Sequence, residues 1–381
     1  MVGVRELLFW LLVGGIAYTY AGYPLLLWCL ARLRPRAIHR ADFTPDLTVI
    51  VTAFNEEKSI GRKLEGLLAQ DYPAPQLDIL VASDGSWDGT EEIVRSFADR
   101  GVRLLRVPGR VGKTETQNRA VREAHGELLV FTDATTRLDP GAIRNVACNF
   151  ADPAVGCAIG HLSYVPQDSR GVGSGATSYW KYERLIKQWE SGIGSLTGAT
   201  GCFYAVRKSV YREIDPELIS DFVVALNTYE AGYRVIYDQS VLSYEQAMED
   251  PRREFGMRVR VALRSYWALW NNRRLLNPLR HGLFSVQLIS HKLLRYAVPL
   301  FLLGLVVVNV SLIGDPLYAC VLFLQSIFYL SALTIHLGLT LGLPVGPLSK
   351  PYYFVLANLA ALVALLKFAR GERIVSWTPL R

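Results

Sequence analysis

The sequence predicts an α/β domain, a parallel sheet covered by helices, that is flanked by membrane-length apolar segments. Strand-like and helix-like patterns alternate through the middle of the chain, which is typical of a parallel sheet with covering helices. Of the 381 residues, 51% are hydrophobic and 20% are charged, and the apolar excess lies towards the two ends. We therefore expect a globular domain that is anchored in a lipid bilayer.

Four short apolar runs predict the strands of this domain, at residues 47–53, 77–82, 102–107 and 128–132. The intervening helices begin near Asn55, a good N-cap, and cover 90–99 and 113–124. In open α/β sheets, ligands bind beyond the carboxyl ends of the strands. The residues at these ends are Ala53, Phe54, Asn55 and Glu56, then Ser83, Asp84 and Gly85, then Asp133, Ala134 and Thr135. We expect the three groups to meet in one crevice.

The amino-terminal region predicts a membrane anchor. Residues 7–30 contain no charged side chain and are long enough to cross a hydrocarbon core of roughly 30 Å. A cleavable signal peptide is the alternative, but the apolar run is longer than such a peptide needs and no small-residue cleavage site follows it. We take 1–31 as the anchor and 32–45 as a basic linker. By the positive-inside rule, the linker lies in the cytoplasm.

The remaining boundaries follow from the same patterns. Residues 46–250 form the cytoplasmic domain, 251–292 mix apolar and basic residues as amphipathic helices at the membrane surface, and 293–381 hold two or three spans and a basic tail. We expect a multi-pass protein of the plasma or inner membrane. Three spans would place the tail outside, whereas its lysine and arginine residues favour the inside. Both orientations remain open at this point.

The net charge of +7, from 41 basic and 34 acidic residues, indicates anionic partners. Nucleic acid is disfavoured because no basic stripe with interleaved aromatic residues is present. An anionic membrane surface and an anionic substrate explain the excess more simply. The five cysteines form no CxxC pair and need no disulfide framework.

Two motifs could bind a nucleotide diphosphate. Asp133, with Thr135 two positions on, could hold a divalent cation against a diphosphate, since Mg²⁺ and Mn²⁺ favour one or two carboxylates plus phosphates and water. The alternative is that Asp133 caps a turn. Arg110 and Lys113 flank a glycine at a probable helix start, which suits phosphate, although a solvated basic loop has the same composition. Asp84 and Gly85 likewise fit either a ligand contact or a turn.

Asp221 is a candidate general base. It lies among apolar residues, and partial desolvation raises the proton affinity of a carboxylate towards the useful range. The alternative is a helix N-cap. Arg258 and Arg260 could neutralise a leaving diphosphate, because guanidinium binds phosphate in a fork geometry. Contact with lipid headgroups is the alternative for this pair.

The order of these motifs resembles the family 2 glycosyltransferases, in particular the membrane-embedded branch with the hyaluronan, chitin, cellulose and poly-N-acetylglucosamine synthases. The matching stretches are 51–57, 83–90, 109–113 with Asn118, 131–135, 197–201, 220–222 and 230–235. The resemblance implies a GT-A fold, a nucleotide-sugar donor and a Mg²⁺ or Mn²⁺ cofactor.

The resemblance also implies a role for each matching residue. The base and nucleoside would contact Ala53, Phe54, Asn55, Glu56, Asp84 and Gly85, and the diphosphate would contact Arg110, Lys113, Asp133 and Arg260. Asp221 would deprotonate the acceptor hydroxyl. The acceptor site would be lined by Gly198, Ala199, Thr200 and Gly201, with Trp267 as an aromatic platform. Asp133 and Thr135 would face the metal, and Trp377 resembles a tail residue that touches the nucleotide.

Two departures from the family pattern bear on the product. Thr135 stands where the metal motif has a second acidic or amide residue. The family's QxxRW motif reads Met257-Arg258-Val259-Arg260-Val261 here, so its aromatic residue is missing unless Trp267 or Trp270 replaces it. Processive synthesis is therefore in doubt.

We expect an inverting transfer of sugar from a UDP-sugar to a growing polysaccharide or glycan at the cytoplasmic membrane face. The alternative within this class is a single addition to a lipid-linked or polyprenyl-phosphate acceptor. A nucleotidyltransferase, an inert nucleotide receptor and a transporter are less favoured, the last because the apolar stretches contain almost no ionisable residues. The sequence names no partner protein.

Overall fold

The computed structural model describes residues 3–165, 173–246, 250–341, 343 and 349–375, with only the backbone at 173–179. In this part of the chain, eight strands form one sheet in the order β3-β2-β1-β4-β7-β6-β8-β5. The strands are β1 (Leu47–Ala53), β2 (Leu77–Ser83), β3 (Val102–Arg106), β4 (Leu128–Asp133), β5 (Arg137–Leu138), β6 (Val155–Val165), β7 (Phe203–Arg207) and β8 (Arg234–Gln246). The four strands expected from the sequence are all present.

The direction of the strands divides the sheet into two parts. Strands β1 to β4 are parallel, as predicted. The expectation of a parallel sheet is wrong beyond β4, because β7 runs antiparallel between β4 and β6, and β5 runs antiparallel to β8. A short apolar run has the same pattern in either direction, so strand direction is decided by the pairing partner and the connection rather than by the run itself.

Helices cover both faces of the sheet: α3 (Ile60–Leu68), α4 (Thr90–Arg95) and α6 (Ala142–Cys148) on one, α5 (Lys113–Glu123) and α8 (Ser220–Glu230) on the other. The helix expected near Asn55 begins only at Ile60, after Ser59. Asn55 instead has a left-handed backbone, with φ of 53°. Its side-chain oxygen accepts a hydrogen bond from the backbone of Trp87 at 3.0 Å, so it braces two loops and caps no helix.

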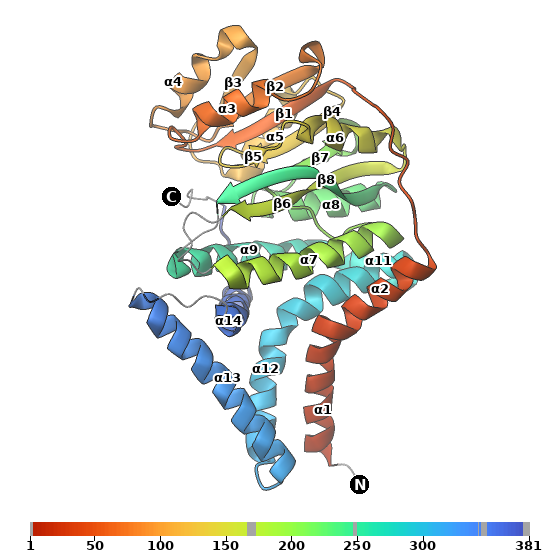
Figure 1. Ribbon diagram of the computed structural model, residues 1–381, viewed down its shortest axis with the longest axis vertical. Helices are drawn as coiled ribbons and strands as arrows, with labels where there is room; N and C mark the ends of the chain where they lie inside the picture. Colours follow the sequence, from red (N-terminus) through yellow and green to blue (C-terminus); the bar gives the residue numbers. More distant parts are fainter. Residues whose placement is uncertain (1–2, 166–172, 247–249, 342, 344–348, 376–381) are drawn as a thin grey trace.

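Apolar helices lie below the domain in Figure 1. They are α1 (Val4–Ala17), α2 (Tyr23–Leu33), α11 (Leu283–Leu288), α12 (Leu294–Ser311), α13 (Pro316–Thr340) and α14 (Ser349–Ala369). By length and composition, four helices of the described chain could cross a membrane: 4–33, 283–311, 316–340 and 349–369. The interface segment expected to end at residue 292 is therefore continuous with α12. Only 6% of the apolar window of α13 is buried, so this helix has a largely exposed apolar surface.

Two long helices separate the sheet from the apolar helices. They are α7 (Gly173–Ile193) and α9 (Pro251–Asn271), and the short α10 (Pro278–His281) follows α9. Figure 1 shows β3 at the edge of the sheet far from the apolar helices, and β6 and β8 next to α7. It also shows α14 nearly end-on, so its axis crosses those of α1, α12 and α13. Leu263 and Tyr266 of α9 pack against Ala360 and Ala364 of α14.

Candidate functional site

Loops after β1 and β2 bring two aromatic side chains together edge to face. The backbone N–H of Asn55 donates to Ser86 Oγ at 3.0 Å, which ties the two loops together. The buried ring of Phe54 lies 5.0 Å from that of Trp87, and the guanidinium carbon of Arg110 lies 4.0 Å from its centre. Trp87 is 73% exposed. Rings with a guanidinium present a surface on which a planar group can stack.

Asp84 holds the loop that follows β3. Its carboxylate is fully buried and accepts hydrogen bonds from the backbone N–H groups of Val111, at 2.8 Å, and Gly112, at 3.1 Å. Burial raises the pKa of Asp84, and these N–H donors oppose the rise. Gly85, with φ of +70°, allows the same loop to approach, because a Cβ there would lie 2.3 Å from the carbonyl oxygen of Gly109. The conformation of the loop 109–113 therefore depends on Asp84 and Gly85.

Lys113 connects two of the three aspartates. Its ammonium forms an ion pair with Asp133 and lies 3.4 Å from the carbonyl oxygen of Gly201. Burial alone would lower the pKa of Lys113, but the carboxylates of Asp133 and Asp221 raise it above its ordinary value. Since Asp84 fixes the residue just before Lys113, the three aspartates gather around one loop.

Asp221 is the second residue of α8, whose N-cap is Ile219, so it does not occupy the N-cap position considered from the sequence. Its Oδ1 accepts a hydrogen bond from the backbone of Phe222 at 2.8 Å, and a Cβ at Gly201 would lie 2.7 Å from its Oδ2. Burial raises the pKa of Asp221, and the positive charges of Lys113, Lys292 and Arg264 oppose the rise. A raised pKa is the property that a carboxylate base needs.

The segment 197–201 lies against the start of α8. Ala199 donates its backbone N–H to the carbonyl oxygen of Asp221 at 3.3 Å. A Cβ at Gly198 would lie 3.3 Å from Phe222, and Thr200 Oγ1 accepts from Lys187 at 2.6 Å. Four residues expected at an acceptor site, Gly198, Ala199, Thr200 and Gly201, thus lie beside the candidate base.

Trp267, also expected there, lies against the carboxyl-terminal segment. Its indole N–H donates to the carbonyl oxygen of Glu372 at 2.9 Å, and the guanidinium of Arg373 stacks on its ring at 4.4 Å. Trp377 lies outside the described residues. Two positions earlier, the backbone of Val375 reaches Gly112, where a Cβ would lie 2.5 Å from the Val375 oxygen. This segment therefore lies on the loop that Asp84 holds.

Asp133 and Glu245 supply the carboxylates that could hold a cation. Thr135 is exposed, whereas its buried neighbour Thr136 donates to Glu245 at 2.8 Å. Burial raises the pKa of Glu245, and the nearby charge of Asp133 raises it further. No group of three or more His, Cys, Asp or Glu residues suited to a metal occurs within the described residues. Two carboxylates that share a cation with substrate phosphates and water fit Mg²⁺ or Mn²⁺.

The two candidate arginines of α9, Arg258 and Arg260, have different surroundings in the structure. Arg258 forms an ion pair with Glu254 at 2.7 Å and lies over the ring of Tyr353. Arg260 is partly buried, which lowers its pKa, and the charge of Asp133 acts against this shift. Arg260 is therefore the one whose charge acts near Asp133.

Sequence reasoning missed four side chains of this region: Lys63, Lys187, Glu245 and Lys292. Lys63 donates to Thr132 Oγ1 at 2.8 Å and to the carbonyl oxygen of Thr136 at 2.6 Å, on either side of Asp133. Burial lowers the pKa of Lys63 to about 7. A lysine at the apolar spacing of Ile60, Leu64 and Leu67 was a usable signal. The other three carried none, because only long-range packing brings them here.

The chain is similar to known glycosyltransferases in sequence. The model of the Glycosyl transferase family 2 matches residues 48–215. The chain is 23% identical over 220 residues to a "Probable glycosyltransferase YdaM" of Bacillus subtilis, covering 54% of this chain and 51% of that protein. It is 24% identical over 243 residues to a "Poly-beta-1,6-N-acetyl-D-glucosamine synthase" of Staphylococcus epidermidis, covering 60% and 58%. The alignments thus span little more than half the length of these relatives.

One solved structure shares the fold over nearly its full length. It is a mannosyltransferase from Pyrobaculum calidifontis in complex with GDP-Man and Mn²⁺, with a TM-score of 0.73 and 22% identity. The match covers 96% of this chain and 99% of that one, apolar helices included. The expected GT-A arrangement of the central domain is confirmed.

Proposed function

We propose that the chain, whose residues 48–215 match the model of the Glycosyl transferase family 2, transfers a sugar from a nucleotide sugar, a UDP-sugar, to a hydroxyl group of a glycan with inversion. The observation that carries this proposal is the gathering of Asp84, Asp133 and Asp221 around the loop of Lys113. Asp84 fixes the loop, Asp133 faces the diphosphate of the donor, and Asp221 acts as the base. A relative named as a polysaccharide synthase and a neighbour that binds GDP-Man support the substrate class.

The transfer follows from these positions. Asp221 takes the proton of the acceptor hydroxyl as that oxygen forms a bond to the anomeric carbon, and the bond from this carbon to the diphosphate oxygen breaks. Lys113 and Arg260 stabilise the negative charge that develops on the leaving diphosphate. Mg²⁺ or Mn²⁺, held by Asp133 and Glu245, would neutralise a further part of this charge when bound.

Two acceptors are compatible with this chemistry, a growing glycan chain and a lipid-linked acceptor that receives one sugar. A specific observation favours the second. Val261 follows Arg260, and Trp267 is engaged by Glu372 and Arg373, so neither provides an aromatic platform beside residues 197–201. Processive synthases need such a platform to hold the polymer, by the resemblance described above. We therefore give single addition to a lipid-linked acceptor as the second candidate.

We also propose a membrane arrangement for the apolar helices. Residues 4–33, 283–311 and 316–340 cross the bilayer, whereas α14 lies along α9 at its cytoplasmic surface. The packing of Tyr266 on α14, the ion pair between Arg373 and Glu217, and the contact of Val375 with Gly112 support this. The tail then lies on the side of the catalytic domain. This arrangement removes the conflict between three spans and a basic tail.

The test is a screen of nucleotide sugars with the purified protein in Mn²⁺ or Mg²⁺, read by UDP release and by mass spectrometry of the products. We expect one donor to release UDP together with a glycosylated acceptor, and Asp221→Asn to lose most of the transfer. A ladder of products indicates polymerisation, and one lipid-soluble product indicates single addition. Release of pyrophosphate from a nucleoside triphosphate, with no UDP from any sugar donor, contradicts the proposal.

A further inference from the structure

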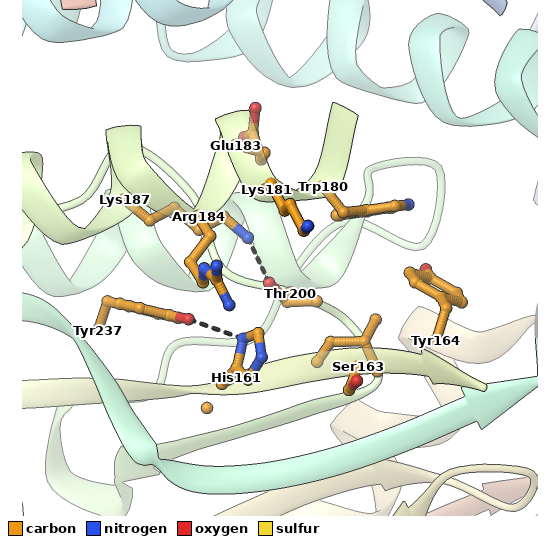
Figure 2. A pocket seen from close by; sticks show the side chains of 12 residues that line it. His161, Ser163, Tyr164, Trp180, Lys181, Glu183, Arg184, Lys187, Thr200 and Tyr237 are labelled. Carbon is orange, nitrogen blue, oxygen red and sulfur yellow. Dashed lines mark hydrogen bonds between the residues drawn. The ribbon is translucent and has the colours of Figure 1, made fainter. Parts of the chain in front are cut away.

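A cavity adjoins residues 197–201, which contribute Thr200 to its lining. It lies between α7 and β6 and encloses about 130 Å³, far more than one water molecule needs. Its polar lining includes Lys181, Arg184 and Lys187 from α7 and His161 from β6. Figure 2 shows the charged groups of Lys181 and Arg184 pointing from the helix towards the strand. No role in sugar transfer has been given to this cavity.

The cavity holds an excess of positive charge. Its three cations recur every third residue, which places them on one face of α7. None of them forms an ion pair with a carboxylate in the part of the chain that the structure describes. Glu183 also lines the cavity, but its carboxylate is engaged by His291, at 2.9 Å, and by Arg295, at 2.6 Å. The local charge is therefore left for a ligand to balance.

The electrostatics of neighbouring groups agree with this geometry. Burial lowers the pKa of Lys187; the negative charge of Glu183 opposes this shift, and the positive charge of Lys292 adds to it. Burial likewise lowers the pKa of His161, with added effects from Arg184 and Lys187. Each of these groups would hold its proton more tightly beside an anion. An anionic ligand is thus favoured over a neutral sugar.

The cavity is connected to the reacting centre through one residue. Lys187 donates to Thr200 at 2.6 Å, and the next residue, Gly201, lies against the carboxylate of Asp221. On the other side of the segment, Lys292 lies 5.5 Å from the ring of Phe222. A ligand in the cavity would therefore lie beside the segment that contacts Asp221.

The cavity also lies on the membrane side of the domain. In Figure 1, α7 lies between the strands β6 and β8 and the apolar helices. The rings of Tyr164 and Trp180, 5.1 Å apart, line one end of the cavity. Such aromatic side chains are enriched where protein meets the lipid headgroup layer. An anion that belongs to a lipid can enter here while its hydrocarbon chain stays in the bilayer.

We propose that this cavity binds the phosphate group of a lipid-linked glycan acceptor, whose sugar hydroxyl then reaches Asp221 across residues 197–201. The proposal rests on the proposed function and names its acceptor class. Arginine binds phosphate with two parallel hydrogen bonds and lysine binds it as a point charge. Arg184, Lys181 and Lys187 provide both kinds of contact on one helix face.

Binding is tested first, without catalysis. The full chain in nanodiscs of zwitterionic lipid is titrated with farnesyl phosphate, with farnesol, and with phosphatidylglycerol as a competing headgroup. We expect farnesyl phosphate to bind about tenfold or more tightly than farnesol, and phosphatidylglycerol not to displace it. Equal affinity for the two farnesyl compounds, or full displacement by phosphatidylglycerol, overturns the proposal.

Variants then locate the bound phosphate. Arg184→Gln is expected to remove most of the preference for farnesyl phosphate. Arg184→Lys is expected to restore part of it, because lysine keeps the positive charge but lacks the two-pronged geometry of the guanidinium group. Arg273→Gln is the matched control, an exposed arginine at the end of α9 that lies outside the cavity. Unchanged UDP binding shows that Arg184→Gln is folded. If Arg184→Gln keeps the preference, the cavity is not the site.

The two proposals fail in different ways. Farnesyl phosphate binding that depends on Arg184, without turnover of any nucleotide sugar, supports the cavity and contradicts the glycosyltransferase proposal. Sugar transfer to a non-phosphorylated lipid glycoside, unaffected by Arg184→Gln, supports the transferase and overturns the cavity.

Discussion

The two halves of the sheet build their parts of the site in different ways. In the donor half, β1 to β4, the functional residues directly follow their strands, and backbone groups hold them, as Val111 and Gly112 hold Asp84. In the acceptor half, β6 to β8 with α7, α8 and α9, side chains distant in sequence hold one another. Tyr237 of β8 and His161 of β6 share a hydrogen bond of 2.9 Å, and Lys187 of α7 donates to Thr200 at 2.6 Å. The donor half is therefore a local motif, whereas the acceptor half depends on the whole fold.

The largest effect is expected from a substitution that alters the acceptor half alone. Asp221→Asn removes the base but keeps the size of the side chain, so we expect transfer to fall by about 10²- to 10⁴-fold. UDP binding in the donor half should be unchanged. The measurement is turnover of the identified donor, together with titration calorimetry of UDP. Asp215→Asn is the control, because Asp215 is exposed and only caps a turn. Near-normal turnover of Asp221→Asn excludes the base role.

The next largest effect is expected from a substitution in the donor half. Gly85→Ala places a Cβ 2.3 Å from the carbonyl oxygen of Gly109 and strains a residue with φ of +70°. Left-handed strain alone costs on the order of 1–3 kcal/mol. We expect the clash to displace residues 109–113 and to raise the KM for the donor about tenfold or more.

Gly101→Ala is the matched control for this change. Gly101 has φ of +85°, but nothing lies within 4 Å of the added Cβ. It therefore reproduces the backbone strain without the clash. Equal donor KM values for the two variants would show that the contact with Gly109 is unimportant.

A smaller effect concerns the boundary between the halves, where Glu245 of β8 lies near Asp133 of β4. Glu245→Gln keeps a partner for Thr136 but removes one carboxylate. We expect the Mn²⁺ concentration for half-maximal activity to rise about tenfold. Glu213→Gln is the control, since Glu213 is exposed and pairs only with Arg122. An unchanged Mn²⁺ requirement assigns the cation to Asp133 without Glu245.

The smallest effect is a shift of the pH profile. The base must be ionised, so kcat/KM falls as the pH drops through the pKa of Asp221, which burial raises above that of an ordinary aspartate. Lys292 lowers this pKa, so Lys292→Gln should move the acidic limb to higher pH. Lys208→Gln, whose ammonium donates to the carbonyl oxygen of Ala124, is the control. A shift to lower pH, or none, contradicts the assignment of this limb to Asp221.

The difference between the halves also decides what could be predicted from the sequence. Strands β1 to β4 and the residues after them could be predicted, because each strand is a short contiguous apolar run and the candidate site residues follow it directly in the sequence. Strand direction beyond β4 and the role of Glu245 were not, since β8 reaches Thr136 only through pairing with β5. Thr135 was expected to face the metal from its place in a motif, whereas the exposed position of this residue depends on the turn.

The contact between Val375 and Gly112 links the membrane helices to the nucleotide loop during biosynthesis. Residues 109–113 leave the ribosome long before residue 375, and the segment that covers them follows α13 and α14. The loop therefore obtains its final packing only after α12, α13 and α14 have been synthesised and α14 has docked on α9. A nascent chain that stops before residue 375 lacks the segment that covers Gly112, so the donor pocket of the proposed function is completed last.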